Sequence, residues 1–458
     1  MFSSTRMRVG ATAVALIGLS MSGAHAESLR AALTASYAHN PSIKSALMAV
    51  KVASENIALR RAAVLPTIGA STSISNTTTA GLSSGSSISN TQTASVGIGY
   101  SQTIFDNHQT DANVEQARAL VEVANQTLRN TEQTVLLDVV EAYMNVILNT
   151  QLVTLRTDTV QFYQSQVKAA QDRQNIGEGT KIDVAQAQAA LASAIASQKA
   201  AVAGLQTAQA SYKHWVGHAP RNLSSDFAYG TLIPGTVEQA LALGDKLNPS
   251  ILGARAAIRA AQAGLDAANA AFGPSVGLTG SFGPSFSSGS ASSGGGAAMV
   301  GTVKLSGSLP IYAGGALGAG SRQANLSAIK SGLDAQAAKD QIDEAVVTAW
   351  SNLQNAAAQI SSANSGVDAN KLALNGVIQE RDVGQKTTLD VLNAEATLQT
   401  SQEALITANA NRVVAAFSLI SATGRLSVQS LKLPTAPKSA QEYESRVEDT
   451  WEEVRALY

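Results

Sequence analysis

The chain contains one long unit twice, and each copy has a short glycine turn between two long stretches with a heptad pattern. Before each turn, apolar or small residues alternate at spacings of three and four, which is typical of coiled-coil helices. The two turns correspond residue by residue at an offset of about 207 positions. The matching pairs are Gly177 and Gly384, Thr180 and Thr387, and Asp183 and Asp390. This duplication predicts a repeat architecture with two helical hairpins that end in similar tips.

Residues 1–26 have the pattern of a cleaved secretory signal peptide. Arg6 and Arg8 precede an apolar run, and the segment ends in the small-residue sequence Ala24-His25-Ala26. The run is too short to span a bilayer, and no apolar run of 18 or more residues follows it, so no transmembrane helix is expected. We therefore expect an exported mature protein that begins at residue 27.

The composition excludes several classes of protein. The net charge is −1, and it becomes −3 without residues 1–26, which contain two Arg and no acidic residue. This balance gives no electrostatic basis for binding nucleic acid. The chain has no Cys, which excludes a disulfide scaffold, cysteine metal sites and an N-terminal lipid-bearing Cys. Because only 4% of the residues are aromatic, one thick globular core is not expected.

The first predicted repeat covers residues 27–235. A short helix over about 28–38 precedes a longer one that begins at Asn40-Pro41, with Asn as the cap and Pro at the first helical position. Val96, Ile98 and Tyr100 alternate with small or polar residues, which predicts a strand with one apolar face. The predicted strands lie at about 67–75 and 95–105 around a loop at 76–92, and the long helices lie at about 107–172 and 182–215. The first long helix would be roughly 100 Å in length.

The second predicted repeat covers residues 236–430. Asn248-Pro-Ser-Ile repeats Asn40-Pro-Ser-Ile after a connecting segment expected to be a loop. The corresponding strands are predicted at about 275–286 and 299–311, with a Ser/Gly loop at 288–296, and the long helices at about 317–381 and 389–422. Residues 431–458 form a charged tail, predicted to be helical from about 437.

Four short strands cannot close on themselves, and an open sheet leaves unpaired edges. In a membrane such edges are costly, because hydrocarbon offers no hydrogen-bond partners. Strands of about 9–11 residues suit a tilted crossing, so several copies of the chain are expected to close one barrel. Three copies would supply twelve strands, an even number within the range of outer-membrane barrels. The alternative is a soluble hairpin packed on helices.

The long helices exceed the thickness of a bilayer several times, so they must project from the strands into an aqueous compartment. Small residues at one heptad position let helices approach closely. Two hairpins per chain in a trimer would give twelve helices, and twelve helices in a ring enclose a lumen. A solid bundle or a coiled-coil stalk remains the alternative from periodicity alone. The fold class expected is mainly α with a β-barrel portion.

Several motifs together resemble the TolC family of outer-membrane channel-tunnels. They are the signal peptide, Asn-Pro-Ser-Ile twice, Pro310-Ile-Tyr-Ala-Gly-Gly, and Val383-Gly-Gln-Lys-Thr-Thr-Leu-Asp-Val-Leu-Asn-Ala-Glu. The resemblance covers nearly all of residues 27–430. It implies a homotrimer in the outer membrane, with a twelve-stranded barrel on a helical tunnel that tapers to a closed tip in the periplasm. It also implies type I protein secretion or multidrug efflux, with a periplasmic adaptor and an inner-membrane ABC or proton-driven transporter.

The resemblance also assigns roles at the tips. Asp390 stands where the family has an acidic ring at the constriction, and Asn393 replaces a second acidic ring. Lys386 occupies a basic position, and Asp183 with its neighbour Ile182 occupies the partner position in the other hairpin. We expect a Lys386–Asp183 latch on this basis. Further gate and docking positions are Arg381, where a Tyr is common, and the adaptor-docking tips at Gly177, Thr180, Gly384 and Thr387.

No arrangement typical of an enzyme or a metal site is present in the sequence. The mature histidines lack paired ligand spacing; they are His39, His108, His214 and His218. No cofactor or metal is therefore expected, and no nucleophile with a neighbouring base is evident. Two other functions remain as alternatives, a periplasmic coiled-coil adaptor and a structural stalk. An adaptor would need a lipoyl-like β-domain and one hairpin per chain, and a stalk would lack the repeated strand pair.

Overall fold

A computed structural model of the chain describes residues 26–81, 88–225, 227, 229–288 and 296–448. The signal peptide predicted at residues 1–26 lies, apart from Ala26, outside this part of the chain. The helices are α1 (Leu29–His39), α2 (Pro41–Arg61), α3 (Gln109–Asn175), α4 (Lys181–Val216), α5 (Val237–Leu247), α6 (Pro249–Ala270), α7 (Ala316–Asp382), α8 (Thr388–Ala422) and α9 (Gln441–Glu448). The strands are β1 (Thr67–Ala80), β2 (Ile88–Phe105), β3 (Ser275–Ser288) and β4 (Gly296–Ser308).

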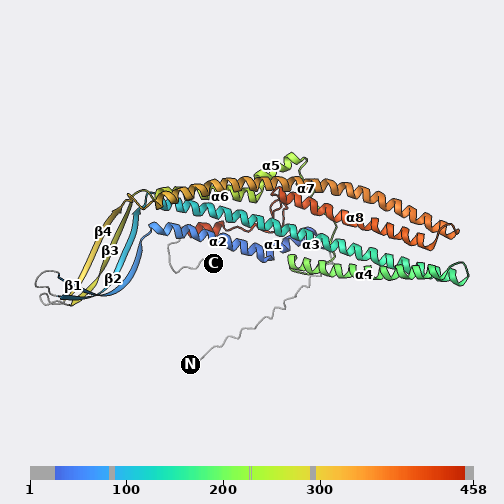
Figure 1. The fold of residues 1–458 in the computed structure, drawn as a ribbon, viewed down its shortest axis with the longest axis horizontal. Helices are drawn as coiled ribbons and strands as arrows, with labels where there is room; N and C mark the ends of the chain where they lie inside the picture. Colours follow the sequence, from blue (N-terminus) through green and yellow to red (C-terminus); the bar gives the residue numbers. More distant parts are fainter. Residues whose placement is uncertain (1–25, 82–87, 226, 228, 289–295, 449–458) are drawn as a thin grey trace, which may run out of the picture.

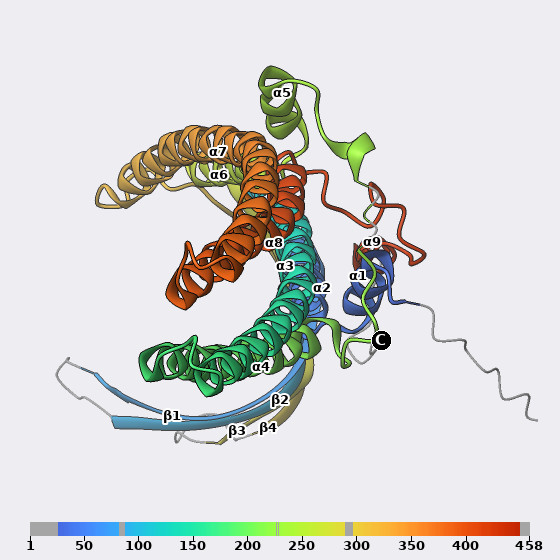
Figure 2. The ribbon, with the colours of Figure 1, turned by 90° about the vertical axis from the view of Figure 1, so that its right-hand side faces the viewer.

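The chain forms a long curved wall. The strands lie at one end, and the hairpins α3–α4 and α7–α8 extend to the other (Figure 1). Seen from the hairpin tips, the helices follow an open arc, with α1, α5 and α9 on its convex side (Figure 2). The predicted class, mainly helical with a small sheet, is confirmed.

The sheet has one apolar face, as predicted. Its order is β1-β2-β3-β4, and every neighbouring pair is antiparallel. The register places Ala70 opposite Ile98 and Ile98 opposite Phe282, and directly opposed residues share a face. The apolar residues on this face are largely exposed in the single chain; they include Ile68, Ile74, Val96, Val303 and Leu305.

Strands β1, β2 and β3 are longer than predicted, whereas β4 has the predicted length but begins and ends three residues earlier. β1 extends to Ala80 and β2 begins at Ile88, so the loop predicted at 76–92 is wrong for all of its described residues except Gly81. The residues added to β1 include a run of three Thr, and β-branched side chains favour strands even without an apolar alternation. Conversely, the strand predicted to residue 311 ends at Ser308, two residues before Pro310, which has no N–H to donate.

Helix ends follow the predicted signals. Asn40 and Asn248 cap α2 and α6, and their side-chain oxygens accept from the backbone of Ser42 and Ser250 at 2.8 and 2.9 Å. Helix α5 was not predicted, because the segment before Asn248 was interpreted as a loop. Thr236 supplies its cap by accepting a hydrogen bond from the backbone of Gln239, and a Thr followed by an apolar pattern could have indicated this helix.

The wall has one order of helices near the sheet and another near the tips. Near the sheet, α2 packs on α3, α3 on α6, and α6 on α7. Towards the tips, α4 packs on α3, α3 on α8, and α8 on α7. The main hydrophobic core lies where α1, α2 and α3 meet the last turns of α4 and α8 and the segment after α8; it includes Tyr37, Leu136, Tyr143, Phe417 and Leu426.

Among the described helices, α8 alone is long and apolar enough to cross a membrane by composition, although no transmembrane helix was predicted. Its most apolar window has a mean hydropathy of 1.3. Because α8 packs along α7 and contacts α3, we describe it as part of the helical wall.

Candidate functional site at the hairpin tips

Both hairpins turn on a glycine with left-handed backbone. The φ angle is +84° at Gly177 and +79° at Gly384, a region that other residues enter only with strain. The backbone N–H of each glycine donates to a carbonyl of the helix before it, Gln174 at 3.1 Å and Arg381 at 2.9 Å. These bonds close the ends of α3 and α7, so the tips are defined turns.

Each returning helix starts with a reciprocal capping box. In the first hairpin, Thr180 Oγ1 accepts from the Asp183 backbone N–H at 3.2 Å, while Asp183 Oδ2 accepts from the Thr180 backbone N–H at 3.0 Å. In the second, the corresponding distances between Thr387 and Asp390 are 3.2 and 2.8 Å. The Thr hydroxyls also donate to these carboxylates, at 2.6 and 2.8 Å. The Thr and Asp repeated in sequence are therefore helix caps in both hairpins.

The same bonds keep both carboxylates ionised. The hydroxyl of Thr180, followed by its backbone N–H, holds the pKa of Asp183 below its usual range. At Asp390 the backbone N–H of Thr387 has the largest effect on the pKa, its hydroxyl the next, and the charge of Lys386 lowers it further. Asp390 therefore stays negative well below neutral pH, which suits the role in an acidic ring that the family resemblance implied.

The other predicted gate residues lie around these turns. Lys386 is exposed directly before Thr387, Ile182 is 67% exposed in the first turn of α4, and Asn393 is exposed on α8. Among the ion pairs of the described residues, none joins Lys386 to Asp183 within the chain. The Lys386–Asp183 latch that was expected between the two hairpins therefore stays a prediction.

Arg381 connects the two hairpins. Its Nη1 donates to Oε1 of Gln166 on α3 at 2.8 Å, while Nε and Nη2 lie 3.0 and 2.7 Å from Oδ1 of Asp382. The Arg381 side chain is 11% exposed and Gln166 is 9% exposed. Because both side chains are largely removed from water, losing either one would leave the other without a hydrogen-bond partner that water could easily replace. Sequence analysis had identified Arg381 but not its partner.

Three further polar contacts join α3 to α8 and were not predicted. Arg156 Nη2 lies 2.5 Å from Oε1 of Glu403. Nearer the tip, the hydroxyl of Tyr163 donates to the Leu392 carbonyl at 3.4 Å, and Arg173 lies 3.5 Å from the Thr388 hydroxyl. The α3 residues that make these contacts, together with Gln166, form two pairs with a spacing of seven residues, and the pairs lie next to each other on one side of the helix. This polar stripe was the available sequence signal; it consists of Arg156, Tyr163, Gln166 and Arg173.

A buried acid lies in the same seam. Glu395 is 8% exposed, and burial raises its pKa. Burial also raises the pKa of Tyr163, with a further contribution from the charge of Glu395. The α3–α8 contact between the two hairpins therefore combines apolar residues with charged groups that are costly to bury.

In the part of the chain that the structure describes, no group of three or more His, Asp or Glu is placed to hold a metal ion. The tips present ionised carboxylates, exposed apolar side chains and turns, and these groups can bind or repel ions and contact another protein.

Comparison with known proteins gives a consistent result. The profile of the family described as "Outer membrane efflux protein" matches residues 32–218 and 241–425. The chain is 36% identical over 443 residues to outer membrane efflux protein BepC of Brucella suis biovar 1, and this alignment covers 96% of the chain and 95% of BepC. It is 27% identical over 434 residues to outer membrane protein TolC of Escherichia coli K12, and that alignment covers 91% of the chain and 87% of TolC.

Solved structures share the fold. The outer-membrane channel OprN aligns with a TM-score of 0.74 and 20% identity, over 86% of this chain and 89% of that one. The open state of the MtrE outer membrane channel of Neisseria gonorrhoeae aligns with a TM-score of 0.72 and 22% identity, over 88% and 90%. At these identities the likeness concerns the fold alone, and it extends over nearly the whole length of each channel.

Proposed function

The chain belongs to the outer membrane efflux protein family, and from this we propose that three copies of it close into one gated duct. The strands would form the part of the duct within the outer membrane, and the long helices would form its part in the periplasm. The observation that carries the proposal is that the strands of the sheet and the helices packed next to the sheet follow one another in the same order. Both layers are therefore open at the same two sides of the chain.

The sheet is open at β1 and β4, since each of these strands is paired on one side only within the described chain. An unpaired edge would be costly in a membrane. Pairing β4 of one copy with β1 of the next would remove both edges. The exposed apolar face of the sheet would then contact lipid.

The helical wall near the sheet follows the strand order, since α2, α3, α6 and α7 pack in that sequence. Its free edges are therefore α2 and α7. Both carry exposed apolar side chains at helical spacing, which are Met48, Val52 and Leu59 on α2, and Leu326, Ile329 and Leu333 on α7. Contact between α7 of one copy and α2 of the next would cover both stripes, directly below the joined strands. An adaptor or a stalk would not need these coincident edges.

The tips would form the gate of this duct. Arg381 and Gln166 connect the α7–α8 hairpin to the α3–α4 hairpin within each copy, and Asp390 would supply three negative charges around the constriction. The exposed turns at Gly177 and Gly384 are the proposed docking points for a periplasmic adaptor, through which an inner-membrane ABC or proton-driven transporter would act. Opening would require the Arg381–Gln166 contact to break.

The test is single-channel conductance of the purified protein in planar bilayers. We expect a heat-resistant oligomer with low conductance in the native protein and several-fold higher conductance in Arg381→Ala. Gln166→Ala should have a similar effect, and the double variant should add little, because the two residues act as one contact.

Arg255→Ala is the matched control, since Arg255 in α6 pairs with Asp245 in α5, and neither helix is part of the tips. Unchanged conductance in both Arg381→Ala and Gln166→Ala would reject this gate. A monomeric protein that does not conduct would reject the duct itself.

A further inference from the structure

Glu27 is held by hydrogen bonds to its backbone and its side chain, and the proposed gate does not require these bonds. Its N–H points at two carbonyl oxygens, those of Arg221 at 3.2 Å and Asn222 at 3.0 Å. Its own carbonyl accepts from the Ser224 N–H at 2.9 Å, and the hydroxyl of Tyr143 lies 2.7 Å from it. The segment that follows α4 therefore lies alongside residue 27, as a parallel bridge between Glu27 and Leu223.

The backbone that presents the two carbonyls is unusual. Asn222 has a φ of +43°, in the left-handed region that non-glycine residues seldom enter. Such local strain persists only where the surrounding structure enforces it. Here it accompanies two neighbouring carbonyl oxygens that converge on a single nitrogen.

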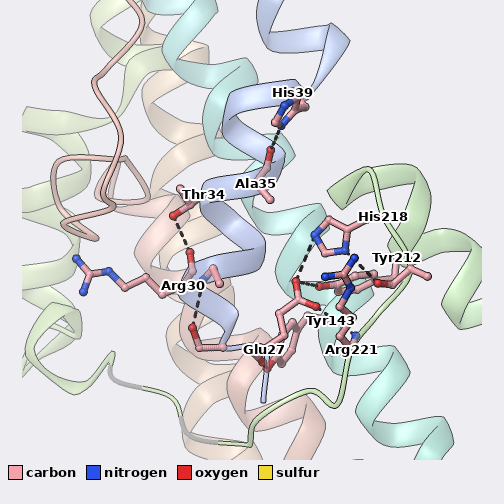
Figure 3. Close-up of polar contacts among 12 residues, drawn as sticks. Glu27, Arg30, Thr34, Ala35, His39, Tyr143, Tyr212, His218 and Arg221 are labelled. Atoms are coloured by element: carbon pink, nitrogen blue, oxygen red, sulfur yellow. Dashed lines mark hydrogen bonds and ion pairs between the residues drawn. The ribbon is translucent and has the colours of Figure 1, made fainter. Parts of the chain in front are cut away.

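The side chain of Glu27 is anchored as firmly (Figure 3). Its Oε1 accepts from the Tyr212 hydroxyl at 2.7 Å and lies 3.5 Å from His218 Nε2, and its Oε2 accepts from the Arg221 backbone N–H at 3.2 Å. The side chain is 10% exposed. By contrast, the residue before it, Ala26, is exposed.

Two independent observations concern the bond between Ala26 and Glu27. The sequence pattern predicts that the signal peptide is cleaved at this bond, and the nitrogen that cleavage would free is the one that donates to the Arg221 and Asn222 carbonyls. We propose that the Arg221 and Asn222 carbonyls form a docking site for the primary ammonium of the processed chain. This inference rests on the proposed signal peptide and is independent of conductance.

The chemistry favours the processed terminus over the precursor. The amide nitrogen of the precursor has one hydrogen, which must be shared between two carbonyls. A primary ammonium has three hydrogens and a positive charge, and hydrogen bonds from a charged donor are about twice as strong as neutral ones. The carboxylate of Glu27 adds a negative charge to the same site. Cleavage therefore strengthens a contact that ties the start of the chain to α3, through Tyr143, and to α4, through Tyr212.

The first test is chemical accessibility of the terminus in the native oligomer. Intact mass establishes the first residue, and an acylating reagent at neutral pH then labels the α-amine. We expect the terminus to react at least tenfold more slowly in the folded protein than after denaturation, whereas the exposed Lys213 should react at similar rates in both. Equal rates at the terminus would overturn the docking site.

A second test moves the ammonium without altering Glu27. Insertion of Gly-Ser between Ala26 and Glu27 leaves an amide at residue 27 after cleavage. We expect a lower Tm and a freely reactive terminus in this variant, and an unchanged Tm would contradict the proposal. If the native mass instead shows a first residue other than Glu27, the signal-peptide prediction fails, so the two failures are distinguishable.

Discussion

At the scale of single residues, Asp183 and Asp390 each have two roles. Each carboxylate caps the helix that it begins, and each is held ionised by the same hydrogen bonds. The sequence resemblance had assigned Asp390 a role at the constriction alone. The structure shows that its carboxylate also accepts hydrogen bonds from the backbone and the hydroxyl of Thr387, so in the proposed gate one side chain would supply the charge and stabilise the turn.

This link predicts a pH dependence at the tip. Because the folded pKa of Asp390 lies below the unfolded value of about 3.9, the stabilisation is complete above that value and is lost as the pH falls through the folded pKa. The protection of the backbone amides of residues 383–395 against hydrogen exchange, relative to the intrinsic exchange rate at each pH, should fall below about pH 4 in the native protein. Asp390→Asn should have reduced protection already at neutral pH and show little further change. Asp368→Asn, on the exposed side of α7, is the control, and an acid response retained in Asp390→Asn would contradict this prediction.

At the scale of elements, equivalent helices of the two repeats have different surroundings. α3 and α7 both have 67 residues, but 22 residues of α3 are buried in the chain and only four of α7 are. α3 lies inside the wall, packed on α2, α4, α6 and α8, whereas α7 lies at its edge. The duplication thus gives one central helix and one helix available for contact with another copy.

Among the strands, the β2–β3 pairing depends on a close approach at Gly283. A Cβ added there would lie 2.0 Å from the Val96 carbonyl oxygen and 2.6 Å from the Cα of Gly97. Gly283→Ala should therefore separate the strands at a cost of about 1–3 kcal/mol, and lower the yield of heat-resistant oligomer. Gly277→Ala in the same strand is the control, because its Cβ would be no closer than 3.8 Å to any atom. Equal oligomer yields for the two variants would show that the approach is not important.

At the scale of the whole molecule, the curved wall in Figure 2 is one sector of the proposed ring. Its curvature places the free edges α2 and α7 where neighbouring copies would meet. In the single chain, Val52 and Leu59 are 66% and 68% exposed, and Leu326 and Leu333 are 65% and 67% exposed. A protein that worked as a monomer would leave these apolar stripes in water.

The edge contact predicts that one charge can prevent assembly. Ile329→Glu places a carboxylate in the apolar stripe of α7, where burial against another copy would leave it unpaired. We expect a folded monomer in detergent, detected by its mass in light scattering, in place of a trimer. Gln341→Glu is the matched control, since Gln341 is exposed on another side of α7. A trimer that persists in Ile329→Glu would place the interface elsewhere.

The amino-acid sequence by itself determined the features that repeat or have a local cause. The heptad seams predicted the long helices, the repeated glycines predicted the two turns, and the alternation around Val96 and Phe282 predicted the apolar face of the sheet. Each of these signals acts over a few residues, through backbone conformation or side-chain period. The resemblance to a family came from the sequence motifs, which include Asn-Pro-Ser-Ile in both repeats and the segment that begins at Val383.

Only the tertiary structure decided which distant groups meet. The contact of Arg381 with Gln166, the burial of Glu395 and the docking of Glu27 depend on how far one helix is shifted and rotated against another. A heptad pattern specifies which side of a helix is apolar but leaves its partner and its axial position open. For the same reason the family resemblance led us to expect a contact between Lys386 and Asp183, whereas the structure shows the Asp183 carboxylate hydrogen-bonded to Thr180, the cap of its own helix.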